Sequence, residues 1–285
     1  MLHTIEGNID YDESGTGPTI VFVPGSCSTA AAWRPVIAAL SDRFRCVATS
    51  LPGYGGTRER RSAEDCSIWH PAEAVEAVVQ HAGGPVHLVG HSFGGLVALA
   101  VALRQRVALQ SLTVIEAPAP ELLRACGELN HYLAFRAMTE SYFAAYDSGD
   151  QLAIARMIDF YEGADAFAAL PPRVRSYAVE TTPVNRWDWL SAYSFGPSPA
   201  TLGGLTVPTL VMIGENSHPA AQRANELLCM HIRGAGLAIV KDAAHFMIST
   251  HSSETARFIA SHVTCFDAAR LRRPVSRDRA DQRRR

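Results

Sequence analysis

The chain has 285 residues, 47% of them hydrophobic and 19% charged, with a formal net charge of −2 at pH 7, which suits one large α/β domain with an insertion. No apolar run approaches the ~20 residues that cross a bilayer, and residues 1–6 lack the basic and apolar regions of a secretory signal, so we expect a cytoplasmic protein with no membrane segment. Six scattered cysteines without a C-x-x-C pair favour reduced thiols and argue against a metal site.

Short apolar strands alternate with helices in the first part of the chain. Residues 2–12 alternate as an edge strand does, and a Gly/Pro turn at 15–18 follows. Buried strands are predicted over 19–23, 46–49, 86–89 and 112–115, and helices over 33–40, 71–82 and 96–103. This alternation predicts an α/β fold with a mostly parallel sheet and helices on both faces, in which loops at the strand ends carry the functional residues.

About eighty residues after Pro118 break this rhythm, and their pattern is helical and rich in aromatic side chains. A helical cap inserted between two strands explains both the position and the aromatic content, since apolar lids supply the walls of binding sites. The rhythm resumes with strands over 209–214 and 237–240 and helices over 220–229 and 253–263. We predict a core made of residues 1–117 and 201–267, and a cap made of residues 118–200.

The end of the chain, residues 268–285, is rich in arginine. Its last sixteen positions hold eight arginines against two aspartates, so the rest of the chain carries a charge near −8. A solvated, disordered extension is the simpler interpretation of this composition. Clustered arginines would also attract an anionic partner such as nucleic acid or lipid headgroups. Because no other feature of the chain supports such a partner, we expect no binding to nucleic acid or membranes.

Gly90-His91-Ser92-Phe93-Gly94 lies between the strand 86–89 and the helix 96–103. A serine on a sharp strand-to-helix turn, with glycines where a β-carbon would collide with the backbone, is typical of a nucleophile elbow. With Trp33, the Leu51-Pro52-Gly53-Tyr54-Gly55 turn and the loop around His245, this motif makes residues 10–265 resemble the α/β-hydrolase family. The resemblance implies a mostly parallel sheet, an inserted helical cap and a serine nucleophile, Ser92.

A serine hydroxyl needs an adjacent base to become a nucleophile. His245 follows the strand 237–240 after four intervening residues and precedes the last helix. This position resembles the family's catalytic histidine loop, which implies that His245 is the base. His87 and His91 lie in or beside the elbow strand, and we expect both to be structural.

The acid is where the chain departs from the commonest pattern of the family. The usual aspartate after the strand 209–214 is missing, and Ser217 stands in its place. The haloalkane dehalogenase branch and some esterases instead carry a glutamate at the end of the strand that follows the elbow helix, and Glu116 occupies that position here. The resemblance therefore implies Glu116 as the acid that orients His245, with Glu215 as the rival candidate.

An oxyanion hole needs two fixed N–H donors. The elbow supplies one from Phe93, the residue after the nucleophile. By resemblance to the family, the second donor is Ser26 N–H, in a loop where Pro24 replaces the histidine that is frequent in the family. Cys27 follows Ser26 and has no evident partner that would lower its pKa, so we expect it to be an ordinary thiol. We expect the substrate pocket under the cap to involve Cys27, Trp187, Trp189 and Phe246.

These residues predict a serine hydrolase that cleaves a carboxylic ester of a small to medium, apolar molecule through an acyl-enzyme. The same catalytic groups would also serve a thioester, lactone or C–C bond hydrolase or a lyase, and the fold could serve as a non-catalytic small-molecule receptor. The chain has no Gly-x-Gly-x-x-Gly motif, Walker loop or histidine-rich cluster, so we expect no nucleotide cofactor and no metal.

Overall fold

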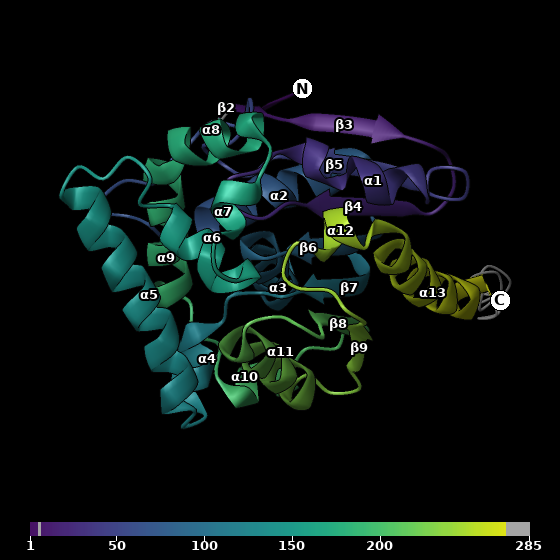
Figure 1. The fold of residues 1–285 in the computed structure, drawn as a ribbon. Helices are drawn as coiled ribbons and strands as arrows, with labels where there is room; N and C mark the ends of the chain where they lie inside the picture. Colours follow the sequence, from purple (N-terminus) through teal and green to yellow (C-terminus); the bar gives the residue numbers. More distant parts are fainter. Residues whose placement is uncertain (5–6, 272–285) are drawn as a thin grey trace, which may run out of the picture.

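The computed structural model describes residues 1–4 and 7–271, and a seven-stranded sheet forms its centre (Figure 1). The strand order is β3-β5-β4-β6-β7-β8-β9, with β3 antiparallel to β5 and all other neighbours parallel. The strands are β3 (Tyr11–Ser14), β4 (Thr19–Val23), β5 (Arg45–Thr49), β6 (Val86–His91), β7 (Leu109–Ile115), β8 (Thr209–Gly214) and β9 (Gly236–Val240). The mostly parallel sheet predicted from the alternating pattern is confirmed.

The N-terminal segment differs from the single edge strand predicted over residues 2–12. Strands β1 (Leu2–Thr4) and β2 (Gly7–Ile9) pair with each other antiparallel in a separate two-stranded sheet, and only β3 forms the edge of the main sheet. Alternation of polar and apolar residues indicates that a segment is extended, but it does not indicate with which strand the segment pairs. The predicted strand is therefore three short strands.

Helices cover both faces of the sheet. One face carries the 3-10 helix η1 (Ala30–Trp33) and the helices α1 (Arg34–Ala38), α12 (Met247–Thr250) and α13 (Ser252–Leu271), and the other carries α2 (Trp69–Ala82), α3 (Phe93–Arg104) and α11 (Pro219–His231). Each face has its own cluster of buried hydrophobic side chains. Helices on both faces explain why the central strands are apolar on both sides.

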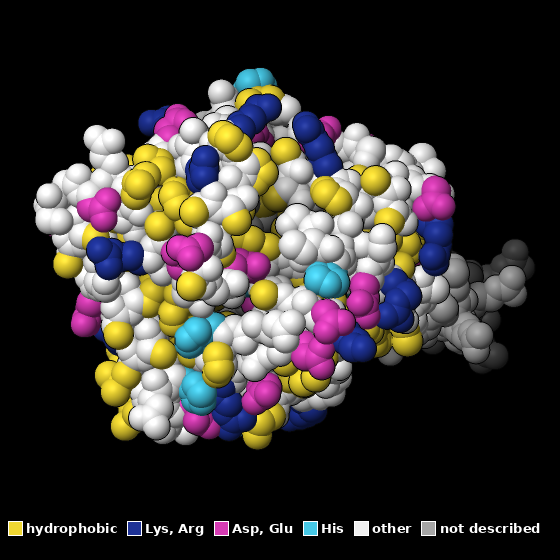
Figure 2. All heavy atoms as spheres, viewed as in Figure 1, with side chains coloured by type: hydrophobic (Ala, Val, Ile, Leu, Met, Phe, Trp, Pro, Cys, Tyr) yellow, Lys and Arg dark blue, Asp and Glu magenta, His cyan; other side chains and the backbone are white. Residues whose placement is uncertain are grey.

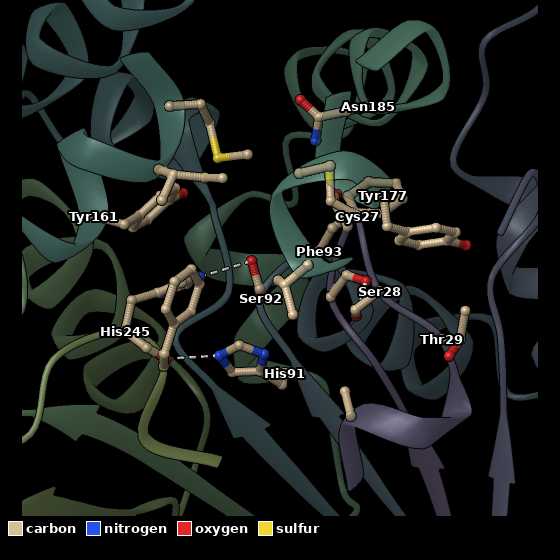
Figure 3. Close-up of a pocket in the computed structure, with 18 of the residues that line it drawn as sticks. Cys27, Ser28, Thr29, His91, Ser92, Phe93, Tyr161, Tyr177, Asn185 and His245 are labelled. Atoms are coloured by element: carbon tan, nitrogen blue, oxygen red, sulfur yellow. Dashed lines mark hydrogen bonds between the residues drawn. The ribbon is translucent and has the colours of Figure 1, made fainter. Parts of the chain in front are cut away.

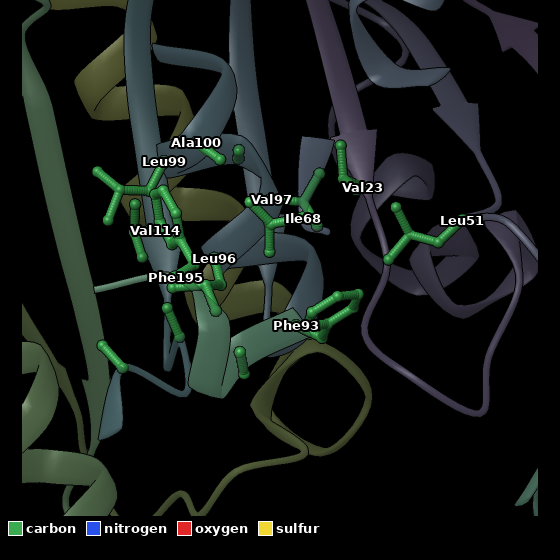
Figure 4. Close-up of a cluster of buried hydrophobic side chains, with 14 of the residues drawn as sticks. Val23, Leu51, Ile68, Phe93, Leu96, Val97, Leu99, Ala100, Val114 and Phe195 are labelled. Carbon is green, nitrogen blue, oxygen red and sulfur yellow. The ribbon is translucent and has the colours of Figure 1, made fainter. Parts of the chain in front are cut away.

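Helix α3 is the most deeply buried helix of the core, and it begins at the predicted elbow. Figure 4 shows its side chains Leu96, Val97 and Leu99 packed among Val23 of β4 and Val114 of β7. Most of its residues are buried, so the helix is apolar on every side, as a central helix must be. The packing fixes the first turn of α3, and therefore Ser92, against the ends of the central strands.

A helical insertion between β7 and β8 forms the cap, at the left of Figure 1. Its helices are α4 (Pro120–Ala125), α5 (Leu129–Asp147), α6 (Ala155–Glu162), α7 (Ala166–Ala169), α8 (Pro172–Glu180), α9 (Thr182–Ser194) and α10 (Pro199–Gly203). Four of these helices have proline in their first turn, where no backbone N–H is needed. The inserted helical cap predicted from the break in rhythm is confirmed.

The last helix, α13, continues to Leu271, so it includes the first residues of the segment that we expected to be an extension. The expectation of disorder for the remaining tail concerns residues 272–285, which lie outside the described residues. Within the described ranges, no helix is both long and apolar enough to span a bilayer.

Candidate active site

Ser92 lies at a strained turn between β6 and α3, with φ 54° and ψ −129°. The turn requires glycine nearby, because a Cβ on Gly90 would clash with the carbonyl of Gly94, and a Cβ on Gly94 would clash with the carbonyl of Pro24. A Cβ on Gly25 would lie 2.8 Å from Cβ of Ser92. The glycines therefore let two loops approach the serine closely, and the strained backbone presents its hydroxyl.

Three distant segments meet at this serine. His245 Nε2 lies 2.9 Å from Ser92 Oγ (Figure 3), and His245 Nδ1 lies 2.7 Å from Glu116 Oε2. Glu116 directly follows β7, with φ 48°, and His245 stands in the loop after β9. Because parallel strands end at the same edge of the sheet, their terminal loops bring these side chains together.

Glu116 is fully buried, and hydrogen bonds satisfy both of its carboxylate oxygens. Oε2 faces His245, and Oε1 accepts from Gly214 N–H at 2.8 Å and from the hydroxyl of Ser217. Burial would raise the pKa of Glu116, but the hydrogen bond and charge of His245 and these donors outweigh it and lower the pKa below its usual range. Ser217, at the position where the family usually has its acid, thus supports a carboxylate from another strand.

The rival acid, Glu215, lies on the surface and is not brought to His245. Its Oε2 accepts from the backbone N–H of Asp242 at 3.0 Å. The residue sits in a turn at the end of β8, where its own N–H donates to the carbonyl of Val240. Glu215 therefore braces the loop that leads to His245, and Glu116 alone of the two is in contact with the imidazole.

His91 supports the same loop from below. Its Nε2–H donates to the backbone carbonyl of His245 at 2.8 Å, and the two rings lie 4.8 Å apart. Burial, together with the charge of His245, lowers the pKa of His91 to about 3. The imidazole is therefore neutral at physiological pH and acts as a hydrogen-bond donor, in the structural role that we expected for it.

The cap contacts the His245 loop from above. The ring of Tyr161, on α6, stacks on the ring of His245 with centroids 4.0 Å apart and an interplanar angle of 22°. The next residue of the cap, Glu162, accepts a hydrogen bond from the backbone N–H of Phe246. The carboxylate of Glu116 and the stacked ring of Tyr161 thus hold the imidazole, and hydrogen bonds from His91 and Phe246 hold the backbone of its loop. Together these contacts restrict the orientation of the imidazole.

The two expected oxyanion donors belong to two segments that meet near Ser92. Phe93 N–H is at the first turn of α3, and Ser26 N–H belongs to the loop after β4. Neither N–H has a hydrogen-bond acceptor within the described ranges. Cys27, with φ 54°, supplies the left-handed bend of this loop. The Oγ of Ser50 accepts from Ala30 N–H at 3.0 Å and so holds the segment that follows this loop.

Sequence reasoning missed a buried polar cluster centred on Asp188 of α9. Its Oδ2 accepts from the hydroxyls of Ser26 and Tyr54, each at 2.5 Å, and its Oδ1 lies 2.7 Å from Nη1 of Arg61. Arg61 also pairs with Glu59 at 2.7 Å. Burial raises the pKa of Asp188, while Arg61 and the two hydroxyls oppose that rise. This Asp188 cluster (Ser26, Tyr54, Glu59, Arg61 and Asp188) joins the cap to the oxyanion loop.

A cavity of about 810 Å³ opens at Ser92, between the cap and the core. Figure 2 shows the surface hollowed between the cap helices and the segment around α12, with hydrophobic side chains around the hollow. Its walls are largely apolar and include Met157, Ile158, Leu170, Val174, Ala178, Ala192 and Ile248. Arg34 and Arg173 also line it.

Of the four residues expected in the substrate pocket, Cys27, Trp189 and Phe246 line this cavity and Trp187 does not. The cavity face of α9 carries the residues at helical spacing from Asn185, and position 187 falls off that face. The prediction for Trp187 is therefore wrong. Burial raises the pKa of the Cys27 thiol to about 12, so this side chain contributes an uncharged wall.

Comparison with known proteins agrees with this architecture. Residues 20–258 match the alpha/beta hydrolase family. The chain is 37% identical to haloalkane dehalogenase 2 of Mycobacterium tuberculosis over 100 residues, which are 35% of this chain and only 35% of that protein. It is 27% identical to the putative carbamate hydrolase RutD of Azorhizobium caulinodans over 248 residues, 85% of this chain and 90% of RutD.

Among solved structures, a thermophilic esterase from Thermogutta terrifontis has a similar fold, with a TM-score of 0.70 and 22% identity over 90% of this chain and 93% of the esterase. Such a low identity supports the fold and leaves the substrate open. Since the family match spans the elbow, the cap and the sheet except its edge strand β3, this chain belongs to the alpha/beta hydrolase family.

Proposed function

We propose that this α/β hydrolase cleaves carboxylic esters through an acyl-enzyme on Ser92. The observation that carries the proposal is the hydrogen-bonded series Glu116, His245, Ser92, which ends at a largely apolar cavity. A hydroxyl in contact with an imidazole, which is itself oriented by a buried carboxylate, is the arrangement that activates serine for acyl transfer.

The reaction has two halves. Ser92 Oγ attacks the ester carbonyl carbon while His245 Nε2 takes the hydroxyl proton, and His245 then gives this proton to the departing alcohol. Water next attacks the acyl carbon and gives a proton to His245, and Ser92 recovers a proton as the acid leaves. Glu116 keeps the proton of the neutral imidazole on Nδ1 and stabilises the imidazolium. These groups supply nucleophile, base and acid, so the chemistry needs no cofactor.

Phe93 N–H and Ser26 N–H would hold the negative charge that develops on the carbonyl oxygen. Both lack another hydrogen-bond acceptor in the described part of the chain, so they are free to donate to the oxyanion. Removing one such donor typically lowers kcat by about 10²–10³-fold.

The serine favours acyl transfer over dehalogenation. Displacement of a halide by a serine oxygen would leave an ether, which water does not cleave readily, whereas attack on an ester leaves an acyl-serine that water hydrolyses. The cavity of about 810 Å³ lies within the range typical of small-molecule sites, about 300–1,000 Å³, and its walls are largely apolar. We infer a small to medium acyl ester as the substrate class.

A panel of p-nitrophenyl esters of graded acyl length tests the proposal, with release of p-nitrophenol as the readout. We expect a pre-steady-state burst for the purified protein and no burst for Ser92→Ala. Ser261→Ala is the matched control, because this exposed serine on α13 does not line the cavity and has no role in the proposed chemistry. Hydrolysis of no ester, or equal hydrolysis by the Ser92→Ala protein, would contradict the proposal, and tight ligand binding without turnover would indicate a receptor.

A further inference from the structure

Two polar side chains of the cap line the cavity, and each carries a buried polar atom with no hydrogen-bond partner among the described residues. Tyr161, on α6, and Asn185, on α9, are 3% and 1% exposed, and the Tyr161 hydroxyl and Asn185 Oδ1 are buried without a hydrogen bond. Figure 3 shows Asn185 above Ser92 and Tyr161 beside His245, both directed toward the cavity. Native proteins pair almost all buried polar groups, so two unpaired groups on one cavity indicate a missing partner.

Their surroundings argue against a role in folding. Asp188, one helical turn after Asn185 on the same face of α9, also lines the cavity, and its carboxylate is fully satisfied by Arg61 and two hydroxyls. Within residues 1–4 and 7–271, five other buried side-chain atoms lack partners, and none of them belongs to a residue that lines the cavity. The polar groups that hold the cap in place are therefore paired, whereas Tyr161 and Asn185 are left available.

The chemistry of the two groups selects an uncharged oxygen function. A phenol and a carboxamide donate and accept hydrogen bonds without charge. Burial, followed by the charge of Glu116, raises the pKa of Tyr161 well above its usual value, so its hydroxyl keeps its proton. The negative charge of Glu116, which acts on the Tyr161 hydroxyl, disfavours an anionic group beside it.

The stacking of Tyr161 on His245 also fixes where this function lies on the substrate. The imidazole contacts Ser92 Oγ at 2.9 Å, and the Tyr161 ring lies 4.0 Å from the imidazole. A group that reaches the Tyr161 hydroxyl is therefore close to the reacting carbonyl. This inference rests on the proposed esterase function: we propose that the substrates are esters with a neutral hydroxyl group near the ester, which donates to Asn185 Oδ1 and accepts from the Tyr161 hydroxyl.

Matched esters test this inference. Phenyl 3-hydroxybutanoate and phenyl 3-methylbutanoate differ by a hydroxyl in place of a methyl group of similar size. Because a site that hydrogen-bonds a hydroxyl rejects the apolar analogue strongly, we expect kcat/KM to favour the hydroxy ester by about a hundredfold. We expect Tyr161→Phe and Asn185→Leu each to reduce this ratio by about tenfold or more. Equal kcat/KM for the two esters in the unmodified protein would overturn the inference.

Tyr193→Phe is the matched control, because Tyr193 is a cap tyrosine whose hydroxyl contacts Thr139 at 2.9 Å and does not line the cavity. We expect it to leave the ratio unchanged, and an equal loss in this variant would overturn the inference. Thermal unfolding is a second readout, since replacing an unpaired polar group with an apolar one does not weaken folding. A clearly lower Tm for Asn185→Leu would show a structural partner and contradict the assignment.

A binding experiment separates this inference from the esterase proposal. The N-phenyl amides of the same two acids resist hydrolysis, and calorimetry with the Ser92→Ala protein measures their affinities. We expect the hydroxy amide to bind more tightly, and equal affinities would overturn the inference even if esters are hydrolysed. Failure to hydrolyse either ester, with a binding preference for the hydroxy amide, would count against the esterase proposal while supporting the assignment of Tyr161 and Asn185 to a ligand hydroxyl.

Discussion

Replacing Asp188 with asparagine is expected to weaken both folding and turnover. The carboxylate accepts the hydroxyl protons of Ser26 and Tyr54 on one oxygen and faces the guanidinium of Arg61 on the other, at 2.5, 2.5 and 2.7 Å. The side chains of Asp188 and Arg61 are 2% and 0% exposed. An amide of the same shape removes the charge and turns one oxygen into a donor, which opposes the donors that face it.

The structure sets the size of the expected loss. Removing one partner of a buried ion pair typically costs about 3–5 kcal/mol, because the other charge stays buried. Arg61 keeps Glu59 at 2.7 Å, so we expect the lower end, about 3 kcal/mol in the free energy of unfolding. Loss of the Ser26 anchor would loosen one oxyanion donor, and since losing a donor costs about 10²–10³ in kcat, we expect a fall of about 10–10²-fold.

A double-mutant cycle with Arg61→Met tests this reasoning by urea unfolding and by the steady-state hydrolysis of a p-nitrophenyl ester. Removing both charges leaves no buried ion of the Asp188–Arg61 pair alone, and Glu59, which loses Arg61, is 23% exposed and reaches water. We therefore expect the double variant to be more stable than the sum of the single losses predicts, by about 2 kcal/mol. Additive losses, or an Asp188→Asn protein with the unfolding free energy and kcat of the original, would refute the account of this cluster.

Three further predictions concern single residues. Glu116→Gln is expected to lower kcat by about 10⁴-fold, whereas Glu215→Gln stays within about twofold because Glu215 does not contact the imidazole; the reverse order, measured on the same ester, would reassign the acid. Because the pKa of Cys27 is raised to about 12, only about one Cys27 side chain in ten thousand is a thiolate at pH 8. Mass spectrometry after treatment with iodoacetamide should therefore find the exposed Cys265 modified and Cys27 intact. Rapid modification of Cys27 would contradict this prediction. The pKa of His91 is lowered to about 3, so between pH 6.5 and 3 the unfolded chain binds a proton there that the folded chain does not. The free energy of unfolding then falls with decreasing pH, by up to about 1.4 kcal/mol per pH unit. When it is measured by urea unfolding at several pH values, the His91→Gln protein should show a smaller decrease than the original protein. Equal decreases in the two proteins would count against a buried neutral imidazole.

The sheet, the cap and the elbow were predictable because local patterns specify them. Buried strands such as β4 and β8 are nearly continuous apolar runs, and glycines mark the elbow because a β-carbon there would strike the backbone. Glu116 could be proposed from its position at the end of a strand, since the strand ends of a parallel sheet share one edge. Each of these inferences needs only the neighbouring residues and the sheet topology.

The contacts of the cap could not be predicted in the same way. Asp188 lies between Trp187 and Trp189 in the sequence, and its partners Ser26 and Arg61 are more than a hundred residues away. Which residues of α9 face the cavity depends on how the cap is rotated on the core, so Trp187 was assigned to the wrong face. The sequence did contain one indication of this cluster, which is an aspartate, Asp188, between two tryptophans of a predicted helix. A carboxylate buried in such a helix must have a polar partner.

Labelling with a fluorophosphonate probe, followed by peptide mapping, tests the nucleophile most directly, because the probe reacts with an activated serine and remains bound to it. We expect one modified residue, Ser92, with labelling abolished in Ser92→Ala and strongly slowed in His245→Ala. Modification of a different residue, or labelling of Ser92 at an unchanged rate in the His245→Ala protein, would contradict the proposal that this imidazole activates this hydroxyl.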